Sequence, residues 1–154
     1  MCIRDRDGSG KSEASLRLPQ NYDFDFGSRV KGGLAVSPDG KALAVLVGDV
    51  GSQAPIKMAL FEPGTSNPPK MLDTSRHWSG DLRFTPDGKS VAYVIREKGV
   101  DNLWLQPLNG SAGHPITDFK SEQIWSFSLS TDGKSLAVLR GHYDSDVVLL
   151  QESK

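Results

Sequence analysis

The tripeptide Asp25-Phe26-Gly27 is the first feature of the chain that suggests catalytic chemistry. In protein kinases the aspartate of a D-F-G motif binds magnesium. That role also needs an H-R-D-L-x-x-x-N loop, a lysine on a strand after a glycine-rich loop, and an A-P-E motif. None of these partner motifs occurs in the 154 residues. The tripeptide is therefore expected to lie in a linker without a catalytic role.

The side chains of Asn21, Asp23 and Asp25 have the alternate spacing that begins a calcium-binding loop. Such a loop needs glycine at its sixth position and a bidentate glutamate at its twelfth. Here glycine falls at the seventh position, as Gly27, and Gly32 occupies the twelfth. The spacing therefore argues against calcium.

The sequence also lacks the motifs of zinc sites and of catalytic nucleophiles. The histidines His77, His114 and His142 lie far apart in expected loops, and the sequence has neither H-E-x-x-H nor paired C-x-x-C motifs. Zinc sites need such clustered ligands. The serines stand in turns, where hydroxyls bond to the backbone, and there is no G-x-S-x-G motif. We expect no metal, no cofactor and no enzymatic activity.

The tryptophans divide into two kinds of sequence context. Trp104 and Trp125 have apolar neighbours in expected strands, which predicts that both pack in the core. Trp78 follows His77 in an expected loop, and aromatic side chains often anchor interfaces. The candidate binding surface consists of four loop residues: Trp78, His77, His142 and Tyr143.

Composition limits the partners. With 37% hydrophobic and 24% charged residues the chain has the balance of an ordinary globular protein. A net charge of −1 excludes the basic surface that nucleic acid requires. No apolar run is long enough to span a membrane, and the single Cys2 cannot form an internal disulfide. A protein, a peptide or a small molecule is the expected partner.

The elements that would position these residues form a repeat. The segment Ser37-Pro38-Asp39-Gly40-Lys41 returns at residues 85–89 and 130–134 with its Asp, Gly and Lys unchanged. The first two copies are 48 residues apart and the last two 45, and residues 101–106 match 146–151 at the same offset of 45. A period of about 45 residues indicates a repeat architecture. Asp101 and Asp146, which begin the second pair of segments, are expected to cap turns.

Each unit contains short apolar runs separated by turn residues, without helical periodicity. In the first unit we expect strands at 33–36, 42–47, 56–61 and 70–73. In the repeated turn proline presets φ, aspartate accepts backbone hydrogen bonds, and glycine supplies a positive φ. Thr131 replaces proline in the third copy, which weakens the preorganisation of that turn. Four strands in about 45 residues is the composition of a propeller blade.

The S-P-D-G-K-x-[LV]-A pattern, followed by a hairpin and the N-L-W-L of residues 102–105, resembles the WD-like repeat of TolB-type bacterial β-propellers over residues 32–151. This resemblance implies an all-β fold, a β-propeller fragment of about three four-stranded antiparallel blades. The absence of catalytic motifs, together with this architecture, indicates a non-enzymatic module that binds a protein or another ligand. Residues 126–150 are similar to the last blade of propellers fused to bacterial receptor-type serine/threonine protein kinases.

The repeat also predicts how the chain is divided. We expect residues 7–20 to be the last strand of a preceding blade, 21–31 an interblade linker, 32–74 and 75–119 two blades, and 120–154 a C-terminal blade lacking its fourth strand. Residues 1–6 resemble a short recurrent non-native prefix and are expected to lie outside the fold. Closed propellers have about four to eight blades. We therefore expect a C-terminal fragment of a larger bacterial protein, whose unpaired strand edges favour self-association.

Alternative functions remain open from the sequence. The propeller could be the sensor of a receptor-type serine/threonine protein kinase whose catalytic domain lies upstream, or a TolB-like periplasmic scaffold. The gating propeller of a prolyl-oligopeptidase-like hydrolase is less consistent, because it predicts a peptidase domain downstream. The family resemblance implies a periplasmic or extracytoplasmic location.

Overall fold

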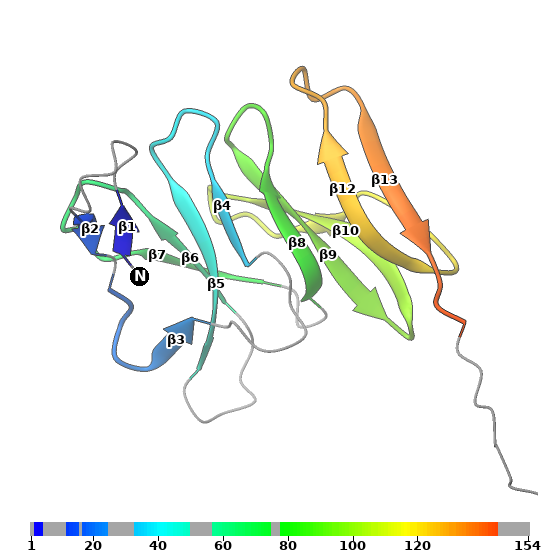
Figure 1. Ribbon diagram of the computed structural model, residues 1–154, viewed down its shortest axis with the longest axis horizontal. Helices are drawn as coiled ribbons and strands as arrows, with labels where there is room; N and C mark the ends of the chain where they lie inside the picture. Colours follow the sequence, from blue (N-terminus) through cyan, green and yellow to red (C-terminus); the bar gives the residue numbers. More distant parts are fainter. Residues whose placement is uncertain are drawn as a thin grey trace, which may run out of the picture.

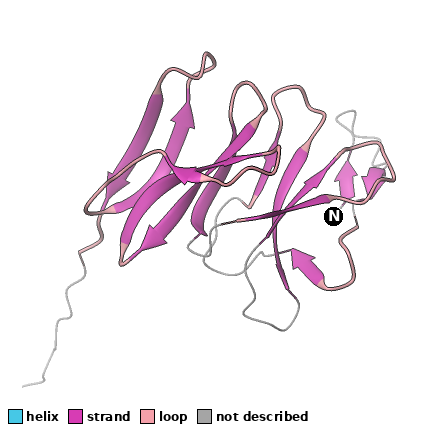
Figure 2. Ribbon diagram, turned by 180° about the vertical axis from the view of Figure 1, so that it is seen from behind, coloured by secondary structure: helices cyan, strands magenta, loops and turns pink. Residues whose placement is uncertain are grey.

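The computed structural model describes residues 2–4, 12–15, 17–24, 33–49, 57–74 and 78–144. Their regular secondary structure consists of β-strands joined by turns and loops (Figure 2). Within these ranges no helix is long and apolar enough to cross a membrane. Three successive antiparallel sheets, one for each repeat unit, lie next to one another along the molecule (Figure 1).

The second sheet shows the repeat unit most completely. Its four strands are hydrogen-bonded in chain order: β8 (Trp78–Phe84), β9 (Ser90–Glu97), β10 (Val100–Pro107) and β11 (His114–Pro115). All neighbouring strands in this sheet are antiparallel. Four antiparallel strands joined by short turns are what the repeat predicts for a blade.

The first sheet has the same plan with one addition. In it β5 (Leu43–Asp49) pairs with β6 (Lys57–Phe61), and β6 pairs with β7 (Lys70–Asp73). Two short strands, β3 (Tyr22–Phe24) and β4 (Leu34–Val36), pair with opposite ends of β5. The four strands expected in this unit are confirmed to within two residues. Strand β3 lies in the segment expected to be a linker.

The third sheet consists, among the described residues, of β12 (Gln123–Leu129) paired with β13 (Leu136–Gly141). The strand expected at 146–151 lies outside the described residues, as do Asp25-Phe26-Gly27. Near the N-terminus β1 (Cys2–Arg4) and β2 (Ser12–Ser15) form a separate antiparallel pair. Strand β1 belongs to the segment that we set aside as a prefix.

The three repeated turns have one geometry, as predicted. In the first turn the Gly40 amide donates to the Ser37 carbonyl at 2.9 Å, and Gly40 has a φ of 72°. The Asp39 carboxylate accepts the Ser37 hydroxyl at 2.7 Å and the Lys41 amide at 3.1 Å. The turns at 85–90 and 130–135 repeat these bonds. Figure 1 shows the three hairpins side by side with their turns on one rim.

Apolar side chains alternate along the second strand of each blade and fill the spaces between blades. Leu43, Val45 and Val47 face one side of the first sheet, whereas Ala44 and Leu46 face the second blade. On the second sheet one set of residues packs against the first blade and the alternate set against the third. Sheets buried on both faces in this way are stacked blades, so the all-β prediction is confirmed.

Candidate binding groove

The structure describes only some of the four residues that the sequence suggests as a binding surface. His77 lies outside the described residues, and so does the side chain of Trp78, whose backbone begins β8 and pairs with Ile95. His142 and Tyr143 follow β13, and Tyr143 is 77% exposed. The described part of the chain therefore places two of the four residues on the surface of the third blade.

The prediction that two tryptophans pack in the core is confirmed for Trp104 and wrong for Trp125. Trp104 packs against the cluster between the first and second blades. Trp125 is 45% exposed, with its ring against Gly141 and its centroid 5.5 Å from that of Tyr143. A register shift between Ile124 and Ser126 is the reason, because it leaves Ile124 facing the second blade and Trp125 on the other side.

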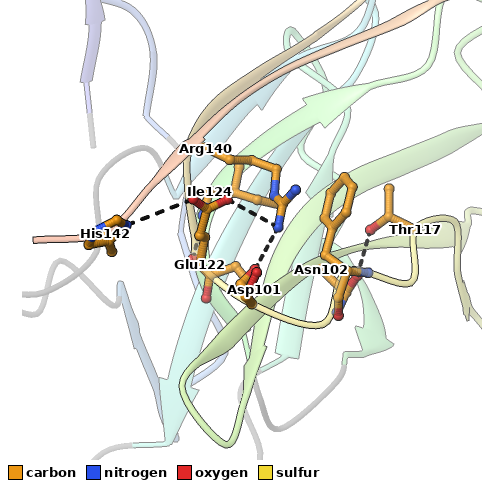
Figure 3. Close-up of polar contacts among 9 residues, drawn as sticks. Asp101, Asn102, Thr117, Glu122, Ile124, Arg140 and His142 are labelled. Atoms are coloured by element: carbon orange, nitrogen blue, oxygen red, sulfur yellow. Dashed lines mark hydrogen bonds and ion pairs between the residues drawn. The ribbon is translucent and has the colours of Figure 1, made fainter.

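His142 belongs to a polar cluster beside β13 (Figure 3). Its ring nitrogens lie 3.8 Å from Glu122 and 3.3 Å from Asp144, pairs that are ionic when the imidazole is protonated. The Arg140 guanidinium lies 3.5 Å from the same Glu122 and 3.6 Å from the centroid of the Phe119 ring. Cation–π stacking of this kind orients the guanidinium. The cluster holds the loop before β12 against β13.

Asn102 fixes the position of that loop. Its side-chain oxygen accepts the Thr117 hydroxyl at 2.9 Å and the Phe119 amide at 2.7 Å, and its amide nitrogen donates to the Phe119 carbonyl at 3.2 Å. The contact between Asn102 and Thr117 is visible in Figure 3. The side chain therefore satisfies backbone groups of a loop that has no strand partner there.

Asp101 joins two blades and does not cap a turn, which corrects the expectation from the sequence. Its fully buried carboxylate accepts Arg96 Nε at 2.6 Å, Arg96 Nη2 at 2.9 Å and the Ile124 amide at 2.8 Å. Ile124 is the second residue of β12, in the next blade. A buried carboxylate is tolerated only when it is paired in this way. Asp146, its equivalent, lies outside the described residues.

The first strands of the three blades form an open groove of about 530 Å³. β4 and β12 both contact β8, which brings residues from three blades to one surface. Eleven residues line the groove: Leu34, Ala35, Val36, Pro38, Leu82, Arg83, Phe84, Pro86, Ser128, Leu129 and Thr131. Most are apolar, and Val36 is 57% exposed although it is aliphatic. Apolar lining with a few polar groups is typical of a ligand site.

Arg83 supplies the one charge among the lining residues. Its side chain is 47% exposed, with Nη2 3.4 Å from Asp81 and the guanidinium carbon 5.6 Å from the centroid of Phe127. An exposed pair at this distance is weak. The guanidinium therefore remains able to bind an anionic or carbonyl group of a ligand.

A second hollow of about 330 Å³ adjoins the groove and shares Pro86 and Leu129 with it. Asp87 and Asp132, from the turns of two blades, line this hollow. Hydrogen bonds from the hydroxyls of Thr85 and Ser130 hold the pKa of the two carboxyls below the usual range. The end of the groove is therefore acidic at neutral pH.

The groove was not predicted from the sequence. His142 and Tyr143 are not among its lining residues. Val36 and Arg83 are exposed lining residues just before two of the repeated turns, but the alternation of apolar residues does not set Val36 apart from a core residue. Among the described residues no group of three or more His, Cys, Asp or Glu side chains could hold a metal ion.

No protein-family model and no curated protein matches the sequence. Among solved structures, TolB from Acinetobacter baumannii is similar, with a TM-score of 0.52 and 23% identity, over 71% of this chain and 26% of that one. The AtxE2 isopeptidase in its apo form has a TM-score of 0.50 and 17% identity, over 75% of this chain and 22% of the other. The chain thus spans about a quarter of the length of these structures. In fold, the chain resembles consecutive blades of a TolB-like β-propeller.

Proposed function

We propose that the chain is a non-enzymatic β-propeller module that binds a protein or peptide segment in the groove formed by its first strands. The observation that carries this proposal is the groove of about 530 Å³ to which three successive blades contribute. This volume is within the range of known ligand sites, about 300–1,000 Å³. Because the lining comes from three blades, an extended ligand would contact all of them, whereas a compact one would not.

The charges around the groove favour a peptide that combines apolar and polar groups. The apolar lining around Val36 and Phe84 would accept aliphatic side chains, and Arg83 would donate to a carbonyl or carboxylate. The acidic hollow at Asp87 and Asp132 would attract a cationic group. Peptides carry all three kinds of group along one backbone.

The lining also supports binding without catalysis. The described lining residues include the hydroxyls of Ser128 and Thr131 but no His, Cys, Asp or Glu side chain. A hydroxyl without a neighbouring base is a weak nucleophile. The full sequence contains no G-x-S-x-G motif either. Fold alone does not decide between binding and catalysis, so the proposal rests on this lining.

The proposal is tested by selecting a phage-displayed library of random dodecapeptides on the immobilised chain. We expect enriched peptides with apolar residues, whose dissociation constants rise about tenfold or more in Val36→Lys, since a lysine would bring a charge into the apolar lining. The matched control is Leu139→Lys, because Leu139 is 58% exposed but does not line the groove. Absence of enrichment, or equal binding to Val36→Lys, would refute the proposal.

A second candidate, a TolB-like periplasmic scaffold, is supported by the likeness in fold to TolB. It predicts export, which an alkaline phosphatase fusion to the complete gene product would report, because that enzyme requires oxidising conditions to form its disulfides. The sensor role beside a serine/threonine protein kinase stays a prediction from residues 126–150.

A further inference from the structure

The turn between β10 and β11 contains the dipeptide Asn109-Gly110, and both residues are exposed. The Asn109 side-chain oxygen accepts the Ser111 amide at 2.9 Å, which folds the side chain over the Gly110 peptide. Gly110 has a φ of 94°, and nothing lies within 4 Å of the position that a Cβ would occupy. The side-chain amide of Asn109 and the backbone nitrogen of Gly110 are therefore neighbours in an open, unhindered turn.

These two groups can react with each other. When the Gly110 nitrogen attacks Asn109 Cγ, a bond forms between the two atoms, the Cγ–Nδ2 bond breaks, and Nδ2 leaves as ammonia with the proton that the nitrogen lost. Water then opens the resulting succinimide ring at either carbonyl, which gives aspartate or isoaspartate. The Ser111 amide favours the attack, because a hydrogen-bond donor at Oδ1 stabilises the negative charge that develops there.

Asn102, seven residues earlier, is held in a way that prevents this reaction. The amide of the next residue, Leu103, donates to the Thr117 hydroxyl at 2.8 Å. The Asn102 side chain itself makes three hydrogen bonds, one to Thr117 and two to the backbone of Phe119. Both the attacking nitrogen and the side-chain amide would have to be released before a ring could close.

The other two asparagines also lack a free nitrogen after them. The amide of Tyr22, which follows Asn21, donates to a backbone carbonyl at 3.0 Å. Asn67 precedes Pro68, which has no backbone N–H. By contrast, no described carbonyl accepts the Gly110 amide in ordinary hydrogen-bond geometry. All four asparagines lie in the described ranges, and the one in the β10–β11 turn is the only one with this freedom.

The three repeated Asp-Gly turns are protected from the same ring closure. Their glycine amides donate to turn carbonyls at 2.8–2.9 Å. Hydroxyl hydrogen bonds hold the pKa of their aspartates below the usual range, so these groups are carboxylates at neutral pH. A carboxylate repels a nucleophile and has no ready leaving group. The β10–β11 turn therefore differs from them in both reacting groups.

We propose that Asn109 is a site of spontaneous deamidation, where ageing of the protein replaces an amide by a carboxylate and adds one negative charge. The site adjoins a contact between blades, because the Lys70 ammonium of β7 donates to the Leu108 carbonyl at 2.6 Å. The isoaspartate product lengthens the backbone by one carbon atom directly after Leu108. Isoaspartyl residues are substrates of methyltransferases that esterify their carboxyl group, so the aged turn presents a substrate for this class of repair enzyme.

The test is peptide mapping by mass spectrometry after the complete chain has been kept at mildly alkaline pH for several weeks. Trypsin releases residues 99–120 as one peptide, which contains both Asn102 and Asn109. We expect the amide of Asn109 to be lost at least about tenfold faster than that of Asn102, because ring closure at Asn102 must first break several hydrogen bonds. An isoaspartyl methyltransferase should label the same peptide, and anion exchange should resolve an acidic species.

The control is Asn109→Gln, which keeps the amide and the charge but would have to close a larger ring. It should age without the acidic species. The proposal is overturned if the amide of Asn109 survives as long as that of Asn102, or if the acidic species forms equally in Asn109→Gln. The urea midpoint of the fresh variant verifies folding. If Asn109→Gln does not fold, Asn109→Ser takes its place, because a serine hydroxyl also accepts the amide two residues on.

Discussion

Replacing Asp101 with alanine isolates the polar contact between the second and third blades. The substitution removes a fully buried carboxylate that accepts two bonds from Arg96 and one from the Ile124 amide. The Arg96 side chain is 41% exposed and can be rehydrated, whereas the hydrogen bond from the Ile124 amide is buried. Most of the stability lost in Asp101→Ala therefore comes from the contact between the second and third blades.

The magnitude follows from these two partners. A buried donor left without an acceptor costs about 1–3 kcal/mol, and a hydrogen bond to a charged group contributes about 1.5–3 kcal/mol. The two Arg96 hydrogen bonds contribute less than this to the free energy of unfolding, because water replaces them in the variant. We expect Asp101→Ala to lower the free energy of unfolding by about 3 kcal/mol.

Urea unfolding and amide hydrogen exchange measure the effect. The exchange rate of the Ile124 amide should rise in Asp101→Ala, while Asp101→Asn, which keeps an acceptor oxygen, preserves more of its protection. Asp118→Ala is the control, because it removes an aspartate whose side chain is 83% exposed and ion-paired with Lys120. A change below about 0.5 kcal/mol in Asp101→Ala, the size of ordinary surface substitutions, would refute the reasoning.

Three other predictions concern close packing and the repeated turns. Gly113→Ala should lower the free energy of unfolding by about 1–3 kcal/mol and change tryptophan emission, because the added Cβ would collide with Trp104 Nε1. The control Gly48→Ala should change neither quantity, because the space around its Cβ is open. Thr131→Pro should raise the free energy of unfolding in urea by about 0.4–1 kcal/mol, and Pro86→Thr should lower it, because proline restricts the unfolded chain. Hydroxyl hydrogen bonds lower the pKa of the three turn aspartates, so their stabilisation is complete above the ordinary value of 3.8 and is lost as pH falls through the folded pKa values. Replacing all three with asparagine should make the urea midpoint less sensitive to pH below about 4, and an unchanged acid profile would contradict this.

The repeated turns could be predicted because their chemistry is local. Asp39 bonds to groups within two residues of itself, and Gly40 adopts the positive φ expected of it. Alternating apolar residues on either side then located the strands to within two residues in the first blade. A pattern of this kind needs no knowledge of distant partners.

Contacts between blades could not be predicted in this way. The amide partner of Asp101 is 23 residues away in another sheet, so the sequence offered only a turn as its role. The exposure of Trp125 depends on a register shift in β12, which periodicity does not reveal. The groove needs residues from three strands at once, and Val36 looks like any core valine until the neighbouring blade is in place.

The equivalence of Ala44–Leu46, Ala92–Val94 and Ala137–Leu139 has a genetic consequence. Recombination between two copies of the repeat, if it joins them in register, adds or removes a whole unit and leaves every remaining face with a suitable neighbour. A crossover displaced by one residue would instead turn each alternating side chain to the wrong side. Changes in the length of this gene should therefore be tolerated in steps of about 45 codons, the length of one repeat.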